Sequence, residues 1–259
     1  MRRMQFVGVD WSGNAKQARK YTWTGVVRDG ELADLSSGRD REELAAHLAN
    51  LAAADEHTVI GIDFAFSMPS WFLAERGLSS AHELWDLAAA EGEEWLASCL
   101  PPFWGRVGTH PPEPEKRFRR DEPTIPRVAG IGPKSVFQVA GAGAVGTGTI
   151  RGLPLLGRLS RAGFSIWPFD PPGWPRIVEI YPRLLTGPVT KSHRVARLAF
   201  LDHDRWSMHS SLRELAADSE DAFDAGISAL VMAEQQDTLE ELPEARDEVE
   251  RLEGRIWYP

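Results

Sequence analysis

Val7-Gly-Val-Asp10 and Ile60-Gly-Ile-Asp63 are two short apolar runs that each end on an aspartate. Short continuous apolar runs are typical of strands that are covered on both faces, as in parallel sheets. If these two strands are parallel neighbours, both aspartates emerge at the carboxyl edge of the sheet, where open α/β sheets bind ligands. The pair therefore predicts an α/β fold that brings Asp10 and Asp63 into one site.

The sequence around these strands predicts a mixed sheet with flanking helices. Residues 21–28 alternate apolar and polar side chains, and Asp29-Gly30 is a hairpin signal before an extended segment over residues 31–35. Apolar residues at helical spacing predict helices over residues 36–54, 69–74, 80–100, 153–162, 190–201, 220–233 and 239–252. Further extended segments are expected over residues 135–139, 165–169 and 176–181.

The stretch from residue 67 to residue 133 is less regular than its surroundings. Its helical part is followed by a proline-rich, basic segment. We therefore expect a single domain over residues 1–259 with an inserted helical and loop segment at about 67–133. The chain has 259 residues, of which 42% are hydrophobic, and this is enough for one large core.

Three further acidic residues join the two strand-end aspartates as candidates. Glu179 lies in the apolar run Ile177-Val-Glu-Ile180, and a buried acid is costly unless it is paired or bound to a metal. Asp221 and Asp224 lie three residues apart in an expected helix, so they share one face and can reach a common cation. Both gain from the helix dipole, and Asp221 could alternatively be a simple helix cap.

Several carboxylates around one point are the ligands that Mg²⁺ or Mn²⁺ prefers. Two such ions roughly 4 Å apart can activate a water and stabilise the leaving oxygen in phosphodiester cleavage. We therefore expect Mg²⁺ or Mn²⁺ as cofactor and a metal-dependent hydrolase as the function. The expected catalytic residues are Asp10, Asp63, Glu179, Asp221 and Asp224, and the expected metal ligands are Asp10, Asp63, Asp221 and Asp224.

The composition limits the other possibilities. Cys99 is the only cysteine, which excludes an intramolecular disulfide and a cysteine-rich zinc site. The formal net charge of -9 argues against indiscriminate binding to nucleic acid, so any such contact must be local. No stretch approaches the roughly 20 apolar residues that cross a bilayer, and the start has no apolar signal core. We expect a cytoplasmic protein that does not bind membranes.

One basic and aromatic cluster stands out, Lys116-Arg-Phe-Arg-Arg120. Such a mixture can stack bases and neutralise phosphates, which makes Lys116, Arg119 and Arg120 candidate contacts to a nucleic acid. A solvated loop balanced by nearby acidic residues is the alternative. The tryptophans of the chain fit either a core or a homodimer contact, and the sequence leaves the oligomeric state open.

Gly141-Ala-Gly-Ala-Val-Gly146 formally matches the dinucleotide-binding fingerprint. The glycine-rich run continues to Gly152, however, so the third glycine is not expected to open a helix cleanly. Phosphate contact through backbone amides and a plain flexible loop are the remaining interpretations. Ser12, Arg151 and His193 are further candidate substrate contacts, with a surface histidine at a helix start as the alternative for His193.

Taken in order, five motifs resemble those of the predicted RNase H-like nucleases of domain-of-unknown-function family 429. They are Gly8-Val-Asp-Trp-Ser-Gly13, Ile62-Asp-Phe-Ala65, Val178-Glu-Ile-Tyr-Pro182, Asp221-Ala-Phe-Asp-Ala225 and Glu253-Gly-Arg-Ile-Trp-Tyr-Pro259. The resemblance implies a ribonuclease H-like or RuvC-like core with a hairpin-extended sheet. It also implies that Asp10, Asp63 and Asp224 are metal ligands, with Asp221 as an addition, and it assigns no role to Glu179.

The chain departs from the family pattern in two places. Phe64-Ala-Phe66 stands where family members usually have a proline, and the glycine-rich residues 140–152 stand where they usually have a lysine. The sequence therefore predicts a nuclease or phosphodiesterase, with two alternatives. One is an ATP-binding phosphotransferase of the actin-like type, which normally needs a duplicated core. The other is a non-catalytic RNase H-like protein that uses the acidic edge to bind a partner.

Overall fold

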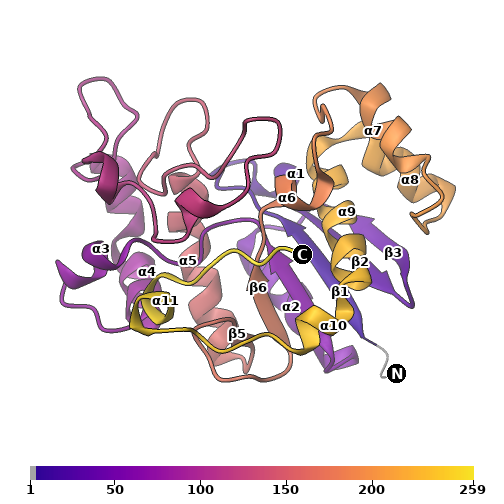
Figure 1. Cartoon of the computed structure of the whole chain (residues 1–259), viewed down its shortest axis with the longest axis horizontal. Coiled ribbons are helices and arrows are strands. Elements are labelled where there is room, and N and C mark those ends of the chain that lie inside the picture. Colours follow the sequence, from indigo (N-terminus) through magenta and orange to yellow (C-terminus); the bar gives the residue numbers. More distant parts are fainter. Residues whose placement is uncertain (1–3) are drawn as a thin grey trace.

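Six strands form one mixed sheet in the order β3-β2-β1-β4-β6-β5 in a computed structural model that describes residues 4–259 (Figure 1). The strands are β1 (Gln5–Asp10), β2 (Trp23–Arg28), β3 (Glu31–Ser36), β4 (Thr58–Ile62), β5 (Ser165–Ile166) and β6 (Arg176–Glu179). Strand β2 is antiparallel to both β1 and β3, whereas β1, β4, β6 and β5 run parallel to one another. The expected α/β fold and the expected hairpin at Asp29-Gly30 are confirmed.

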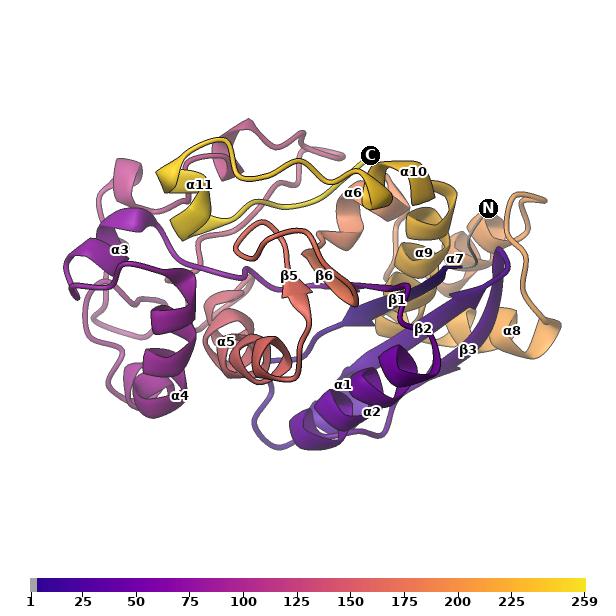
Figure 2. The same cartoon turned by 90° about the horizontal axis from the view of Figure 1, so that it is seen from below.

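Helices cover both faces of this sheet. They are α1 (Ala18–Tyr21), α2 (Arg41–Ala54), α3 (Ser70–Ala74), α4 (Ala81–Ser98), α5 (Gly146–Arg161), α6 (Pro182–Thr186), α7 (Arg194–Leu201), α8 (Ser210–Asp218), α9 (Glu220–Glu234), α10 (Gln236–Glu240) and α11 (Glu248–Glu253). Short 3-10 turns lie at Pro114–Lys116 and Glu122–Thr124. Figure 2 shows the sheet between α9 on one side and α2 on the other. Helices α4 and α5 extend the α2 side, and α8 and α7 extend the α9 side.

Three glycines let α9 lie directly on the sheet. Gly8 pairs with Gly25 on β2 and with Gly61 on β4, so the three form a row across the sheet. A Cβ atom on Gly8 would stand 2.3 Å from the carbonyl oxygen of Ala225 in α9, and one on Gly61 would stand 2.6 Å from the sulfur of Met232. Any side chain here would push α9 away, so the glycines inside the strand motifs set the position of this helix.

Two predicted elements are wrong. Residues 135–139 do not form a strand, because residues 136–137 form a turn that the Gln138 amide closes by donating to the Ser135 carbonyl, and Gln138 makes only an isolated bridge with Trp104. Residues 239–252 do not form one helix, because α10 and α11 are separate. The guanidinium of Arg176 donates to the carbonyls at the end of α10, and the Asp247 side chain caps the start of α11 by accepting from the Glu250 amide.

Other differences concern the extent of elements. Helix α5 begins at Gly146, seven residues earlier than expected, so the glycine-rich run supplies its first two turns. Helices α6 and α8 were not predicted. Helix α7 begins at Arg194 rather than at residue 190. Within the described part of the chain, no helix is long and apolar enough to span a bilayer.

The final segment of the chain returns across the fold. Figure 1 shows it running from α10 out to α11, beside α3, and back toward β6. The Trp257 amide donates to the carbonyl of Glu179 at 2.8 Å, and Ile180 and Trp257 form a parallel bridge. The segment therefore joins the end of β6 to the region that follows β4.

Candidate carboxylate site

Asp10 and Asp63 lie at the carboxyl ends of two adjacent parallel strands. Asp10 is the last residue of β1, and Asp63 directly follows β4. The Asp63 amide donates to the carbonyl of Val9 at 3.0 Å, which continues the ladder between the strands. Both side chains are partly exposed at this edge. The parallel pairing on which their expected proximity depended is confirmed.

Helix α9 brings two more carboxylates to the same place. Ser219 caps the helix, since its side chain accepts from the Ala222 amide at 3.3 Å. Asp221 is therefore not needed as the cap. Asp224 lies almost one turn further along, and both aspartates are close enough to Asp10 to raise its pKa through charge repulsion. The row of glycines beneath α9 is what permits this approach.

Burial holds the pKa values of the four carboxylates above the normal range, and repulsion within the cluster adds to this for Asp10, Asp63 and Asp221. Burial raises the pKa of Asp10 well above its usual value, and Asp224, Asp63 and Asp221 raise it further. Burial and then Asp224 raise the pKa of Asp63 to about 7. The same two causes raise the pKa of Asp221 to about 6, and burial also raises the pKa of Asp224. Such a cluster binds either protons or a cation at neutral pH.

Lys191 supplies a positive charge inside this cluster. Its ammonium donates to Oδ2 of Asp224 at 2.5 Å, and the side chains of the pair are only 10% and 14% exposed. The charge of Lys191 lowers the pKa values of all four aspartates and so opposes the other effects. The guanidinium of Arg197 donates to the Lys191 carbonyl and fixes the loop before α7.

Lys191 was missed by the sequence reasoning, which considered only His193 in this loop. His193 is exposed at the start of α7, and its side chain makes no capping hydrogen bond there. A lysine in a polar loop carries no periodic signal, so its contact with Asp224 depends on the packing of α6 and α7 against α9. An acidic residue in the first turns of α9 could have suggested a basic side chain nearby but could not have identified Lys191 as that residue.

The Glu179 side chain forms its hydrogen bonds and ion pair with residues outside the aspartate cluster. Its carboxylate accepts from the Phe66 amide at 2.9 Å and forms a two-pronged ion pair with the guanidinium of Arg119. Arg119 also donates to Glu122 at 3.0 Å, and all three side chains are buried. The expectation that a buried Glu179 needs a partner is confirmed, and that partner is Arg119. The charge of Glu179 raises the pKa of Asp63.

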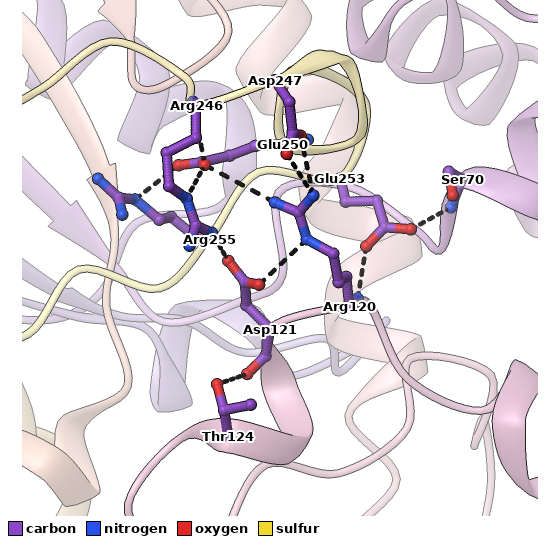
Figure 3. A network of polar contacts seen from close by, with 9 residues as sticks. All are labelled: Ser70, Arg120, Asp121, Thr124, Arg246, Asp247, Glu250, Glu253 and Arg255. Carbon is purple, nitrogen blue, oxygen red and sulfur yellow. Dashed lines mark hydrogen bonds and ion pairs between the residues drawn. The ribbon is translucent and has the colours of Figure 1, made fainter.

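The residues of the basic cluster, which were predicted as substrate contacts, differ in their surroundings. Arg119 is 2% exposed, and its guanidinium donates to Glu179, Glu122 and the Glu253 carbonyl. Arg120 donates to Asp247 at 2.7 Å (Figure 3). Lys116 is exposed, with its ammonium 5.1 Å from the ring centre of Trp71.

Figure 3 shows the polar contacts that attach residues 246–255 of the final segment to the inserted segment at Ser70, Arg120 and Asp121. The Glu253 carboxylate accepts from the Arg120 amide at 2.6 Å and from the Ser70 amide at 2.6 Å. Glu250, which is fully buried, pairs with Arg246 and with Arg255. Basic residues that resemble a nucleic-acid contact in the sequence therefore serve mainly to hold two parts of the chain together.

A cavity of about 630 Å³ opens beside Asp63. It is lined by Glu179 and Tyr181 and, from the glycine-rich run, by Ala144, Val145, Thr147, Gly148 and Thr149. Arg151 lines it and is 15% exposed, but its guanidinium already donates to Glu93 and to the Gly13 carbonyl. Ser12 accepts from the Asn14 amide at 3.2 Å and stabilises the loop after β1.

The glycine-rich run forms the start of α5 rather than a dinucleotide-binding unit. Gly146 does open the helix, contrary to expectation. The preceding residues 135–139 contain a turn and one isolated bridge, however, and the fingerprint requires a strand there. The strand, glycine turn and helix that bind a dinucleotide are therefore not present in this segment.

The residues of the cluster suit a hard divalent cation in their chemistry, although their present arrangement does not assemble a complete site. Among residues 4–259, no group of three or more His, Cys, Asp or Glu side chains is placed to hold a metal ion. The donors available are all carboxylate oxygens, which Mg²⁺ and Mn²⁺ prefer. Oδ1 of Asp224 is buried and has no hydrogen-bond partner among the described residues, so one oxygen of the cluster is left unsatisfied.

Comparison with protein-family models, with curated proteins and with solved structures gives no match for this chain. Its function must therefore be inferred from the arrangement of its own residues.

Proposed function

We propose that this chain is a divalent-metal-dependent nuclease or phosphodiesterase with an RNase H-like core. One observation carries the proposal: Asp10 and Asp63 end neighbouring parallel strands, and α9 lies across those strands with Asp221 and Asp224 in its first turns. The pKa values of these four carboxylates are raised by burial and by neighbouring negative charge, which favours a cation, and the unpartnered Oδ1 of Asp224 belongs to the group.

The order of the elements supports the RNase H-like part of the proposal. The resemblance to family 429 implies an acid on the first strand, an acid on the fourth strand and acids on a late helix. Asp10 ends β1, Asp63 follows β4, and α9 is the last helix longer than six residues. The antiparallel β1-β2-β3 unit beside parallel β4 fits the hairpin-extended sheet that the resemblance implies.

In the proposed reaction Asp10, Asp63 and Asp224 would hold the cation, with Asp221 as an additional ligand. When bound, Mg²⁺ or Mn²⁺ would lower the pKa of a water and neutralise the charge on the leaving oxygen. Asp63, with its pKa at about 7, is half protonated near neutral pH, so a cation there displaces a proton. Lys191 keeps part of the cluster charge compensated before a substrate arrives.

The test is cleavage of labelled single-stranded, duplex and branched DNA and RNA in Mn²⁺. We expect cleavage of at least one substrate by the wild type, and a loss of about 100-fold or more in Asp10→Asn and in Asp224→Asn. Asp204→Asn, which changes an exposed aspartate after α7, is the matched control and should keep full activity. Equal activity in Asp10→Asn and wild type would contradict the proposal.

A second candidate is the non-catalytic binding protein. The observation that favours it is the close pair of Lys191 and Asp224, because an ammonium already neutralises part of the acidic edge without a metal. In that case Mn²⁺ would fail to bind, and no substrate would be cut by any variant. Nothing in residues 4–259 favours the actin-like alternative, since this part of the chain forms a single six-stranded sheet rather than a duplicated core.

A further inference from the structure

The start of α5 forms a wall of the cavity beside Asp63 and has free hydrogen-bond donors. The Gly146 amide donates to the carbonyl of Gln138 at 2.9 Å. The next two amides, of Thr147 and Gly148, have no acceptor among the described residues. Helix α5 is 16 residues long, so its positive end and these amides favour an anion at this place.

A side chain in the same wall points to a ligand independently. Thr149 is fully buried and lines the cavity, yet its hydroxyl has no hydrogen-bond partner. Buried hydroxyls are nearly always paired, because leaving one unpaired in the interior is costly. The residue thus lines the same cavity as Thr147 and Gly148, whose amides are free.

Close packing around the helix start and a nearby positive charge also favour an anion in this cavity. A Cβ atom on Gly13 would lie 2.5 Å from the Gly148 nitrogen, so only glycine allows the loop after β1 to lie against the helix start. Trp11 holds the two together through Nε1, which donates to the Gly148 carbonyl at 2.9 Å. Lys134 lines the cavity, is exposed, and has no ion-pair partner in residues 4–259.

The same cavity is also lined by the acidic residues Asp63 and Glu179. We propose that the start of α5 is a phosphate subsite, in which the amides of Thr147 and Gly148, the Thr149 hydroxyl and Lys134 bind a phosphoryl group of the substrate. The phosphoryl group bound here is not the one attacked beside Asp63. This inference rests on the proposed function, and it specifies the substrate as one with a second phosphate next to the scissile one.

The test measures binding in the absence of metal, so that it does not depend on cleavage. The full chain in EDTA is titrated by calorimetry with a 5′-phosphorylated dinucleotide and with the same dinucleotide lacking the 5′-phosphate. The net charge of -9 disfavours the more anionic ligand, so a preference for it reports a local site. We expect the wild type to bind the phosphorylated form about tenfold more tightly.

Two variants identify the subsite. Thr149→Val replaces the unpartnered hydroxyl by a methyl group of the same shape, so the melting temperature should stay the same or rise. Lys134→Met removes the exposed charge. Each should reduce the preference to less than about threefold. Lys20→Met, an exposed lysine in α1, is the matched control and should keep the full preference. Because Thr149→Val does not weaken the fold, a lost preference there reports binding.

Equal binding of the two dinucleotides by the wild type, including no detectable binding of either, overturns the subsite. A preference that persists in both Thr149→Val and Lys134→Met also overturns it. Asp10→Asn separates this inference from the proposed function, because it should keep the phosphate preference while losing cleavage. A preference without any cleavage by the wild type would contradict the nuclease and leave the subsite in place.

Discussion

The ammonium of Lys191 donates to Oδ2 of Asp224 at 2.5 Å, while Oδ1 of the same carboxylate is buried without a partner. One oxygen is thus neutralised by the chain itself, whereas the other is left without a partner among the described residues. Lys191 lowers the pKa of each aspartate in the cluster, so it limits the repulsion that the folded chain must tolerate. It also competes with a metal ion for the same carboxylate.

Lys191→Met should therefore make the folded state more dependent on added metal. Without metal, the variant loses the ammonium that is bonded to Asp224, and the free energy of unfolding at pH 8 should fall by roughly 1–3 kcal/mol. Addition of Mn²⁺ should then raise the melting temperature of the variant more than that of the wild type. Thermal unfolding with and without Mn²⁺ measures both effects. A smaller Mn²⁺ response in Lys191→Met than in the wild type would contradict the competition.

The raised pKa of Asp63 predicts how stability varies with pH in metal-free buffer. Its pKa is near 3.8 in the unfolded chain and about 7 in the folded chain, so between these values the folded chain binds more protons. The free energy of unfolding therefore falls as the pH rises from about 4 to about 7. Asp63→Asn removes this cost, and at pH 8 the variant should be more stable than the wild type by on the order of 2 kcal/mol.

Denaturant unfolding at pH 4 and pH 8 measures this difference, which should nearly vanish at pH 4, where Asp63 is protonated in the folded chain. Asp204→Asn is the control, because Asp204 is exposed and does not contribute to the pKa shift of any of the four aspartates. The charge argument fails if Asp63→Asn is less stable than the wild type at pH 8.

Arg119 forms buried ion pairs, whereas its neighbour Arg120 forms partly exposed ones. Substitution of the two should therefore differ in its effect on the free energy of unfolding. Arg119→Met leaves Glu179 and Glu122 buried without their cation, which should cost about 3–5 kcal/mol of stability. Arg120→Met removes ion pairs that are 36% exposed on the arginine side, and the loss should be about 1 kcal/mol or less. Urea unfolding of the two variants compares them directly. A similar loss in both would show that the buried ion pairs do not dominate.

The sequence predicted the central sheet because apolar runs that end on aspartate have few structural alternatives. Asp10 and Asp63 were placed on neighbouring parallel strands from the pattern alone, and the register of β1 and β4 confirms this placement. The glycine within each run was part of the motif, but its purpose was not visible. Only the packing of Ala225 against Gly8 shows that the glycines admit α9.

Long-range polar contacts could not be predicted, because they depend on which loops meet. Arg119 looks like a surface residue in a basic run, yet it lies 60 positions before its partner Glu179 and is buried with it. Lys191 lies in a loop without any periodic pattern, and its contact with Asp224 exists only once α6 and α7 have packed against α9. Helix 239–252 was overestimated for a related reason, since Arg176 from β6 stabilises the end of α10.

The most direct test of the account is calorimetric titration of Mn²⁺ into the metal-free wild type, Asp10→Asn, Asp224→Asn and Asp204→Asn at pH 8. If the carboxylate cluster is a metal site, the wild type and Asp204→Asn bind Mn²⁺ with the same affinity, whereas Asp10→Asn and Asp224→Asn bind it about 10–100-fold more weakly. Equal affinity in all four proteins, or no binding by the wild type, would contradict the assignment of this cluster as the metal site.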